Sequence, residues 1–144
     1  MGKKRIVKTK GTTVNKELKN RSLSRTPKRK LAEGTLFVEA TFNNTKVSFA
    51  DNQGNIVFWS STGSLGFKGA KKGTPFAAAK VGELIGEKAK SIGVKEASVI
   101  IKGAGSGREP AIRSFMAHGI ELSKIQDKTP IPHNGTRPRK PRRV

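Results

Sequence analysis

The basic residues of the chain are concentrated at its two ends, and this limits the part that can fold on its own. Residues 1–33 hold 12 basic and 2 acidic residues, and residues 128–144 hold 6 basic residues and no acid. Segments this charged, with few large apolar side chains, cannot bury enough surface to fold alone. Residues 34–127 hold 12 basic and 8 acidic residues and most of the large apolar ones. We therefore expect a basic N-terminal extension (1–33), a globular core (34–127) and a basic, Pro-rich C-terminal tail (128–144).

The overall charge points to a polyanionic partner. The 144 residues carry a formal net charge of +20, which suits nucleic acid, an anionic membrane surface or an acidic protein. The chain has no Cys, so we expect no disulfide framework and no Cys-ligated metal. No apolar run approaches the roughly 20 residues of a membrane span. The first ten residues lack the apolar stretch of a secretory signal.

The first half of the core has the pattern of an antiparallel meander. Residues 35–42 alternate between apolar and polar side chains, a second strand ends at Asp51, and residues 56–59 form a third. Short turns rich in Asn and Gly separate them. The expected inward positions of the first strand are Leu36, Val38, Ala40 and Phe42.

A helix is expected to begin where Thr74 and Pro75 follow a Gly- and Lys-rich loop. Thr is a favoured N-cap, Pro is favoured in the first turn, and Gly93 supplies the stop. The expected inward positions are Phe76, Val81, Leu84, Ile85, Ala89 and Ile92. Gly82 and Gly86 predict close approach to the sheet. Glu83 and Glu87 are expected to pair with Lys80, Lys88 and Lys90 on the outer face.

The second half alternates strands and helices. Residues 97–101 read as a buried strand, 108–118 as a helix with Ile112, Phe115 and Met116 inward, and 120–125 as a last strand. Alternation of this kind favours parallel pairing with crossover helices. The sequence thus predicts an α/β (mixed α+β) single domain. Its mixed five-stranded sheet, a meander followed by β-α-β-α-β, carries two helices.

Two glycine-rich loops are candidates for phosphate binding. Residues 103–107 lie between a strand and a helix, where backbone N–H groups bind anions, and Arg108 adds a guanidinium. A tight turn that needs glycine is the alternative reading. Residues 63–73 carry Lys68, Lys71 and Lys72 around Phe67, which suits RNA backbone and a stacked base. Here the alternative is a core Phe with solvated lysines.

Catalytic chemistry has little support in the sequence. The two histidines, His118 and His133, lie far apart, and no paired carboxylates, P-loop or complete dinucleotide fingerprint are evident. We therefore expect no enzyme, no metal site and no cofactor.

Five strings occur together and carry a resemblance: TFNNT (41–45), DNQGN (51–55), GFKGAKKGTPFAA (66–78), IKGAGSGRE (101–109) and TPIPHNGTRP (129–138). The chain closely resembles the bacterial-type ribosomal protein S11 family of the small subunit over residues 34–144. The resemblance implies binding to small-subunit ribosomal RNA on the platform, near messenger RNA at the exit site, and a role in assembly. It implies as neighbours the sixth, seventh, eighteenth and twenty-first small-subunit proteins.

The candidate RNA contacts come from the resemblance and from the charge of the two ends. The resemblance implies Asn43, Asn44, Lys68, Lys71, Lys72, Gly105, Gly107, Arg108, His133, Asn134, Arg137, Arg139, Lys140, Arg142 and Arg143. The basic N-terminal extension adds Lys3, Lys4, Arg5, Lys28, Arg29 and Lys30.

The resulting prediction is an RNA-binding structural component of the small ribosomal subunit. We expect it in the bacterial cytoplasm, with an organellar ribosome as the other location, and without a membrane or a homo-oligomer. The alternative is a general nucleic-acid-binding or compacting protein with similar affinity for any duplex or strand.

Overall fold

The structure, a computed structural model, describes residues 14–143 and contains one mixed five-stranded sheet. The strands are β1 (Glu33–Ala40), β2 (Thr45–Ala50), β3 (Ile56–Ser61), β4 (Glu96–Lys102) and β5 (Glu121–Asp127). Their order in the sheet is β3-β2-β1-β4-β5. β1 lies in the middle, antiparallel to β2 and parallel to β4, and β5 pairs parallel to β4. The predicted fold class is therefore confirmed.

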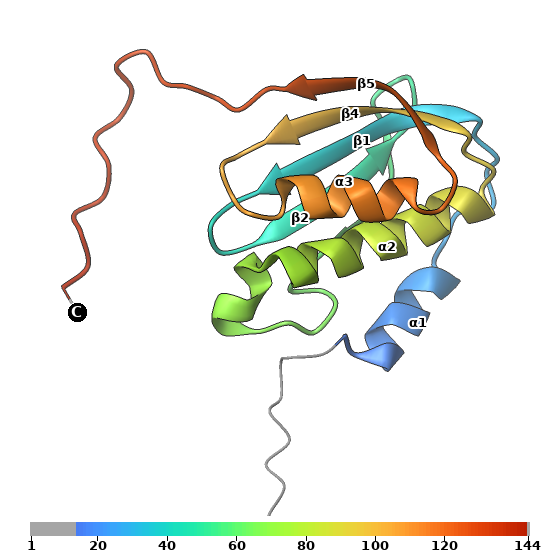
Figure 1. The fold of residues 1–144 in the computed structure, drawn as a ribbon, viewed down its shortest axis with the longest axis horizontal. Coiled ribbons are helices and arrows are strands. Elements are labelled where there is room, and N and C mark those ends of the chain that lie inside the picture. Colours follow the sequence, from blue (N-terminus) through green and yellow to red (C-terminus); the bar gives the residue numbers. More distant parts are fainter. Residues whose placement is uncertain (1–13, 144) are drawn as a thin grey trace, which may run out of the picture.

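Both predicted helices are present, and they cover the same face of the sheet (Figure 1). α2 (Pro75–Ser91) is capped by Thr74, whose hydroxyl accepts a hydrogen bond from the N–H of Ala77 at 3.3 Å. α3 (Arg108–Met116) packs against α2 and follows the second glycine loop. In residues 14–143, no helix is long and apolar enough to cross a membrane.

Two further helical segments were not expected. α1 (Lys16–Ser24) lies in the N-terminal extension beside α2, and η1 (Gly69–Gly73) is a 3-10 helix in the Lys-rich loop. The Asn15 side chain caps α1 by accepting from the backbone N–H groups of residues 17 and 18. No residue of α1 is buried, so the sequence lacks the apolar period that reveals a helix.

The predicted inward faces are largely correct, with three exceptions. Val81, Leu84, Ile85, Ala89 and Ile92 are buried as expected.

Phe42 is 81% exposed, Phe76 57% and Met116 45%, so these three were wrongly assigned to the core. β1 ends at residue 40, and Phe42 lies in the turn beyond the sheet. Phe76 and Met116 lie in the terminal turns of their helices. Periodicity cannot show that a helix or strand has run past the edge of its neighbours.

The two glycines of α2 allow contact with α3, not with the sheet as expected. A Cβ at Gly82 would lie 2.2 Å from the carbonyl oxygen of Ala111, and one at Gly86 would lie 2.3 Å from the His118 ring. Both distances are far below van der Waals contact. The helices therefore approach each other backbone to backbone at Gly82.

The charged face of α2 pairs differently from the prediction. Lys80 does pair with Glu83, at 2.9 Å. Glu87 instead binds the ammonium of Lys19 in α1, also at 2.9 Å. Lys88 is only 4% exposed, and its ammonium lies 5.8 Å from the centre of the Phe58 ring. Its predicted place on the outer face is therefore wrong.

The helix contact predicts the effect of filling Gly82. Gly82→Ala gains about 1 kcal/mol of helix propensity, but overpacking against backbone costs about 1–3 kcal/mol. We expect a lower free energy of unfolding, measured by urea denaturation. Gly86→Ala is the matched control, because its neighbour is a His118 side chain that can rotate. A Gly82→Ala chain as stable as the Gly86→Ala control would contradict the close backbone contact at Gly82.

Candidate nucleic-acid interface

Three loops meet at the end of the sheet where β1, β4 and β5 finish (Figure 1). We call this end, with its three loops, the loop end. It comprises the β1–β2 turn (41–44), the Lys-rich loop with η1 (68–74) and the glycine loop (103–107). Each of these loops contains RNA contacts predicted from the sequence, and the fold brings them together.

The β1–β2 turn is the middle of the three loops. The backbone N–H of Thr41 donates to the carbonyl of Asn44 at 2.8 Å, which closes the turn. The Asn44 side-chain oxygen accepts from the hydroxyl of Thr62, so it is used to hold β3 against the turn. Asn43 and Phe42 are exposed at the tip. Of the two predicted asparagines, Asn43 is therefore the one that faces solvent.

The glycine loop packs against one side of this turn. The N–H of Gly105 donates to the carbonyl of Ala40 at 2.9 Å, and a Cβ there would lie 2.3 Å from the carbonyl oxygen of Thr41. Gly107 is buried against Thr45. Both glycines lie inside the protein surface, and they allow the loops to approach closely.

The Lys-rich loop packs against the same turn. A Cβ at Gly73 would lie 2.2 Å from the carbonyl oxygen of Phe42, and the hydroxyl of Ser106 donates to the carbonyl of Gly73 at 2.8 Å. Phe67 is 2% exposed and belongs to the core, so it does not stack on an RNA base, and the alternative of a core Phe is confirmed. Lys68 is exposed, and Lys71 and Lys72 are partly exposed.

Arg108 joins the glycine loop to the end of β5. Its guanidinium donates to the carbonyl of Gly103 at 2.6 Å and pairs with Asp127. The Thr129 side chain, and then the Arg108 guanidinium, lower the pKa of Asp127 to about 2 by hydrogen bonding to its carboxylate. Arg108 therefore makes two bonds within the protein, with about a third of its side chain exposed.

The C-terminal tail starts at the loop end. The N–H of Lys128 donates to the carbonyl of Ile101, and the Thr129 hydroxyl accepts from the N–H of Gly103. Beyond Pro130 the described tail is exposed, has no helix or strand and runs away from the sheet (Figure 1). Asn134 has a positive φ of 60°. The predicted contacts in this exposed tail are His133, Asn134, Arg137, Arg139, Lys140, Arg142 and Arg143.

The N-terminal candidates do not join this cluster. Lys3, Lys4 and Arg5 lie outside the described residues. Lys28, Arg29 and Lys30 lie near the opposite end of the sheet, because residue 31 bonds to Ile92 before β4 begins.

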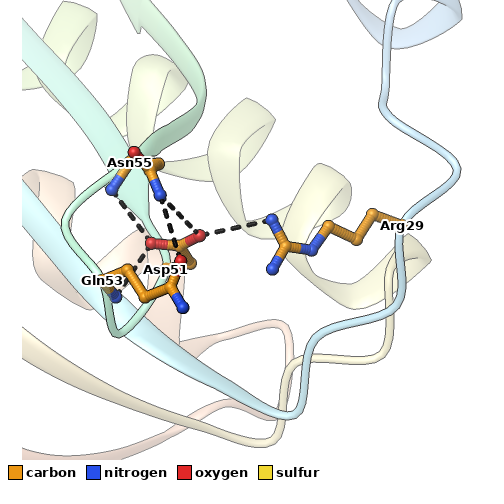
Figure 2. Close-up of polar contacts among 4 residues, drawn as sticks. All are labelled: Arg29, Asp51, Gln53 and Asn55. Atoms are coloured by element: carbon orange, nitrogen blue, oxygen red, sulfur yellow. Dashed lines mark hydrogen bonds and ion pairs between the residues drawn. The ribbon is translucent and has the colours of Figure 1, made fainter.

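Arg29 serves the structure at that opposite end. Figure 2 shows its guanidinium directed at the carboxylate of Asp51, at 3.3 Å. Asp51 is 3% exposed and also accepts from the backbone N–H groups of Gln53 and Asn55. The bond from the Asn55 backbone is the largest cause of the lowered pKa of Asp51.

Comparison with known proteins decides what kind of protein carries this interface. The profile of ribosomal protein S11 matches residues 34–143. A small ribosomal subunit protein uS11 of Treponema pallidum is 51% identical over 120 residues, 83% of this chain and 95% of that relative. The protein of the same name from Gloeobacter violaceus is 50% identical over 117 residues, 81% of this chain and 90% of that relative. The small ribosomal subunit protein uS11c of Cyanidioschyzon merolae is 52% identical over 117 residues, 81% of this chain and 97% of that relative.

The chain belongs to the ribosomal protein S11 family. S11 proteins are structural, non-enzymatic components of the small ribosomal subunit, so the predicted family and the non-enzymatic role are confirmed. The part of the chain that the structure describes holds no group of three or more His, Cys, Asp or Glu residues suited to a metal ion.

Some exposed residues of this S11 chain that are suited to contact RNA were not predicted from the sequence. Phe42 was assigned to the core, and it instead projects beside Asn43 at the loop end. Arg21 belongs to α1, a helix that was not predicted from the sequence, and Arg25 caps the C-terminus of that helix. Trp59 is 56% exposed on the edge strand β3. Only the tertiary arrangement distinguishes these residues from buried or solvated ones.

The Asp51 network predicts a pH dependence of stability. A lowered pKa in the folded state means that the carboxylate stabilises the fold above its ordinary pKa, about 4, and stops doing so as pH falls through the lower folded value. Asp51→Asn should therefore lower the melting temperature at pH 7, and the difference from the parent chain should narrow in acid. Thermal unfolding followed by circular dichroism at several pH values measures this. Arg29→Ala should have a smaller effect, since the side chain is 60% exposed. A constant difference at every pH would argue against the network.

The contact between Arg108 and Asp127 predicts that removing Arg108 changes the pKa of Asp127. Arg108→Ala removes one donor to the Asp127 carboxylate, so the pKa of Asp127 should rise from about 2 while the Thr129 bonds keep it below the ordinary value. Carboxylate carbon shifts in an NMR titration report this directly. Arg113→Ala is the control, because Arg113 pairs with Glu109 instead. An unchanged Asp127 titration in Arg108→Ala would rule out the pairing.

Proposed function

We propose that this S11-family chain binds small-subunit ribosomal RNA through the loop end. The observation that carries the proposal is the convergence of the Lys-rich loop, the exposed turn and the basic tail at one end of the sheet. Phosphate contacts dominate the affinity of proteins for nucleic acid, and each needs a cation that can reach the backbone.

The electrostatics of the loop end favour an anion. Asp127, the acid beside the glycine loop, is paired with Arg108, so its charge is already compensated. α3 begins there at Arg108, its N-cap Gly107 provides no side-chain cap, and a helix N-terminus favours negative charge. The tail adds Arg and Lys residues on an exposed, extended backbone. A chain of this composition orders on binding, and the contacts compensate for the entropy that it loses.

The aromatic content defines the mode of recognition. Phe42 is the large apolar side chain exposed at the tip of the β1–β2 turn, and it can stack one base. The lysines and arginines read phosphate positions, so the chain recognises the shape of folded RNA more than its sequence. This mode suits a structural constituent of an RNA particle.

The proposal extends to the surroundings of the chain. As an S11 protein it would lie on the platform, near messenger RNA at the exit site, and support platform assembly. The sixth, seventh, eighteenth and twenty-first small-subunit proteins are its proposed neighbours. Lys28 and Lys30, exposed at the opposite end of the sheet, would contact RNA there. The proposed location is the bacterial cytoplasm.

The test removes cations at one end of the sheet at a time. Lys68→Met with Lys72→Met should weaken binding of the full chain to small-subunit particles assembled without it. Each lost phosphate contact should also reduce the slope of log affinity against log salt by about one, hence by about two here. Filter binding at several salt concentrations measures both quantities.

The control removes the same charge elsewhere. Lys90→Met with Lys95→Met alters exposed lysines where α2 ends and before β4 begins, and it should leave affinity and slope nearly unchanged. Equal losses in the two double variants would contradict docking by the loop end. Equal affinity for unrelated duplex DNA would favour the general nucleic-acid-binding alternative.

A further inference from the structure

A basic cavity lies between α1 and the edge strand β3, away from the loop end. Its volume is about 490 Å³. Among the described residues three cations line it: Arg21 of α1, Arg25 directly after that helix, and Lys88 of α2. The lining contains no Asp or Glu. The cavity therefore concentrates positive charge in a concave site.

Lys88 is the unusual member of this lining. It is 4% exposed, and within the described residues its ammonium has no carboxylate and no hydrogen-bond acceptor. Its ammonium lies over the Phe58 ring in a cation–π contact, 5.8 Å from the ring centre. Burial lowers the pKa of Lys88. The ammonium itself is not fully enclosed, because Lys88 lines the cavity. A largely buried cation without an anion is costly, so an anion in the cavity would stabilise it.

α1 is held where it completes the cavity. The ammonium of Lys19 binds Glu87 at 2.9 Å, and the N–H of Asn15 donates to the carbonyl of Leu65 at 2.9 Å. These polar contacts, together with the partly buried Leu23 that packs against the core, hold α1 against α2 and the loop after β3. Lys19 thus uses its charge inside the protein, while Arg21 and Arg25 keep theirs for the cavity.

The chemistry of the lining favours a nucleotide over an acidic peptide. Trp59 lines the cavity and is 56% exposed, so its ring is open for a base to stack. Arginines beside an exposed aromatic side chain bind a phosphate and its neighbouring base together. A carboxylate would use the cations and leave the ring uncovered.

We propose that this cavity is a second RNA site, in which Lys88, Arg21 and Arg25 bind a backbone phosphate and Trp59 stacks the adjoining base. The site rests on the proposed RNA-binding function and adds a contact on the β3 edge, separate from the loop end. Binding of the phosphate supplies the anion that Lys88 lacks. Binding would also tie the position of α1 to RNA, because Arg21 belongs to that helix and Arg25 caps its C-terminus.

The decisive variant is Lys88→Met, which keeps a long unbranched side chain and removes the charge. We expect its melting temperature to rise, because an unpaired buried charge is replaced by an apolar group. We expect its affinity for small-subunit particles lacking this chain to fall about tenfold, the usual size of one charge-assisted contact. Higher stability with lower affinity is a combination that a merely structural lysine would not produce.

Two more measurements identify the occupant. Lys90→Met, one exposed lysine further along α2, is the matched control and should keep the parent affinity. Ultraviolet crosslinking of the parent chain in assembled particles, followed by mass spectrometry, should find a nucleotide on Trp59. Lys88→Met and Arg21→Ala should each reduce that adduct.

The outcomes separate this inference from the proposed function. If the parent chain binds and Lys88→Met binds equally well, the second site is wrong and the loop-end proposal stands. If Lys88→Met loses affinity while Trp59 crosslinks to a protein instead of a nucleotide, the occupant is an acidic protein and the RNA site is overturned. If the parent chain fails to bind particles at all, both proposals fall.

Discussion

The architecture depends on the close approach of backbones at the carboxyl end of β1. β1 is the central strand, and the carbonyl of its last residue, Ala40, accepts the N–H of Gly105. On the other side of the same turn, Gly73 lies against the carbonyl of Phe42. A side chain at either glycine would push the loops apart. Three loops from distant parts of the sequence therefore form one surface, on which the Lys-rich loop, the Asn turn and the tail lie together.

The charges of the chain divide into those that hold the fold and those that remain available. Asp51, Glu87 and Asp127 each have a cationic partner, supplied by Arg29, Lys19 and Arg108. With these acids compensated, the excess positive charge is left on the tail, the Lys-rich loop and the cavity beside α1. A folded body with internal ion pairs and exposed cations at its periphery is suited to a polyanion that the protein must bind without unfolding.

Local sequence patterns predicted much of this arrangement. Alternation located the strands, Thr74 and Pro75 located the start of α2, and the glycine loops marked where the chain approaches itself. Errors occurred where burial depends on distant neighbours. Phe42, Phe76 and Met116 follow the period of their elements but lie past the edge of the core. α1 was missed because none of its residues is fully buried; polar contacts to α2 and Leu65 and the partly buried Leu23 hold it.

The sequence by itself determined the family, the order of the five strands and the two helices that pack on the sheet, and the segregation of positive charge to the two ends. These follow from local composition, from spacing and from motifs that can be read without knowing which residues meet. The tertiary structure alone decided which cations are free and which are used. Arg29 and Lys19 form ion pairs, and Lys88 is buried without one, although all three are ordinary basic residues in the sequence. The reason is physical: the role of a charge depends on what lies within a few ångströms of it, and those neighbours come from other parts of the chain.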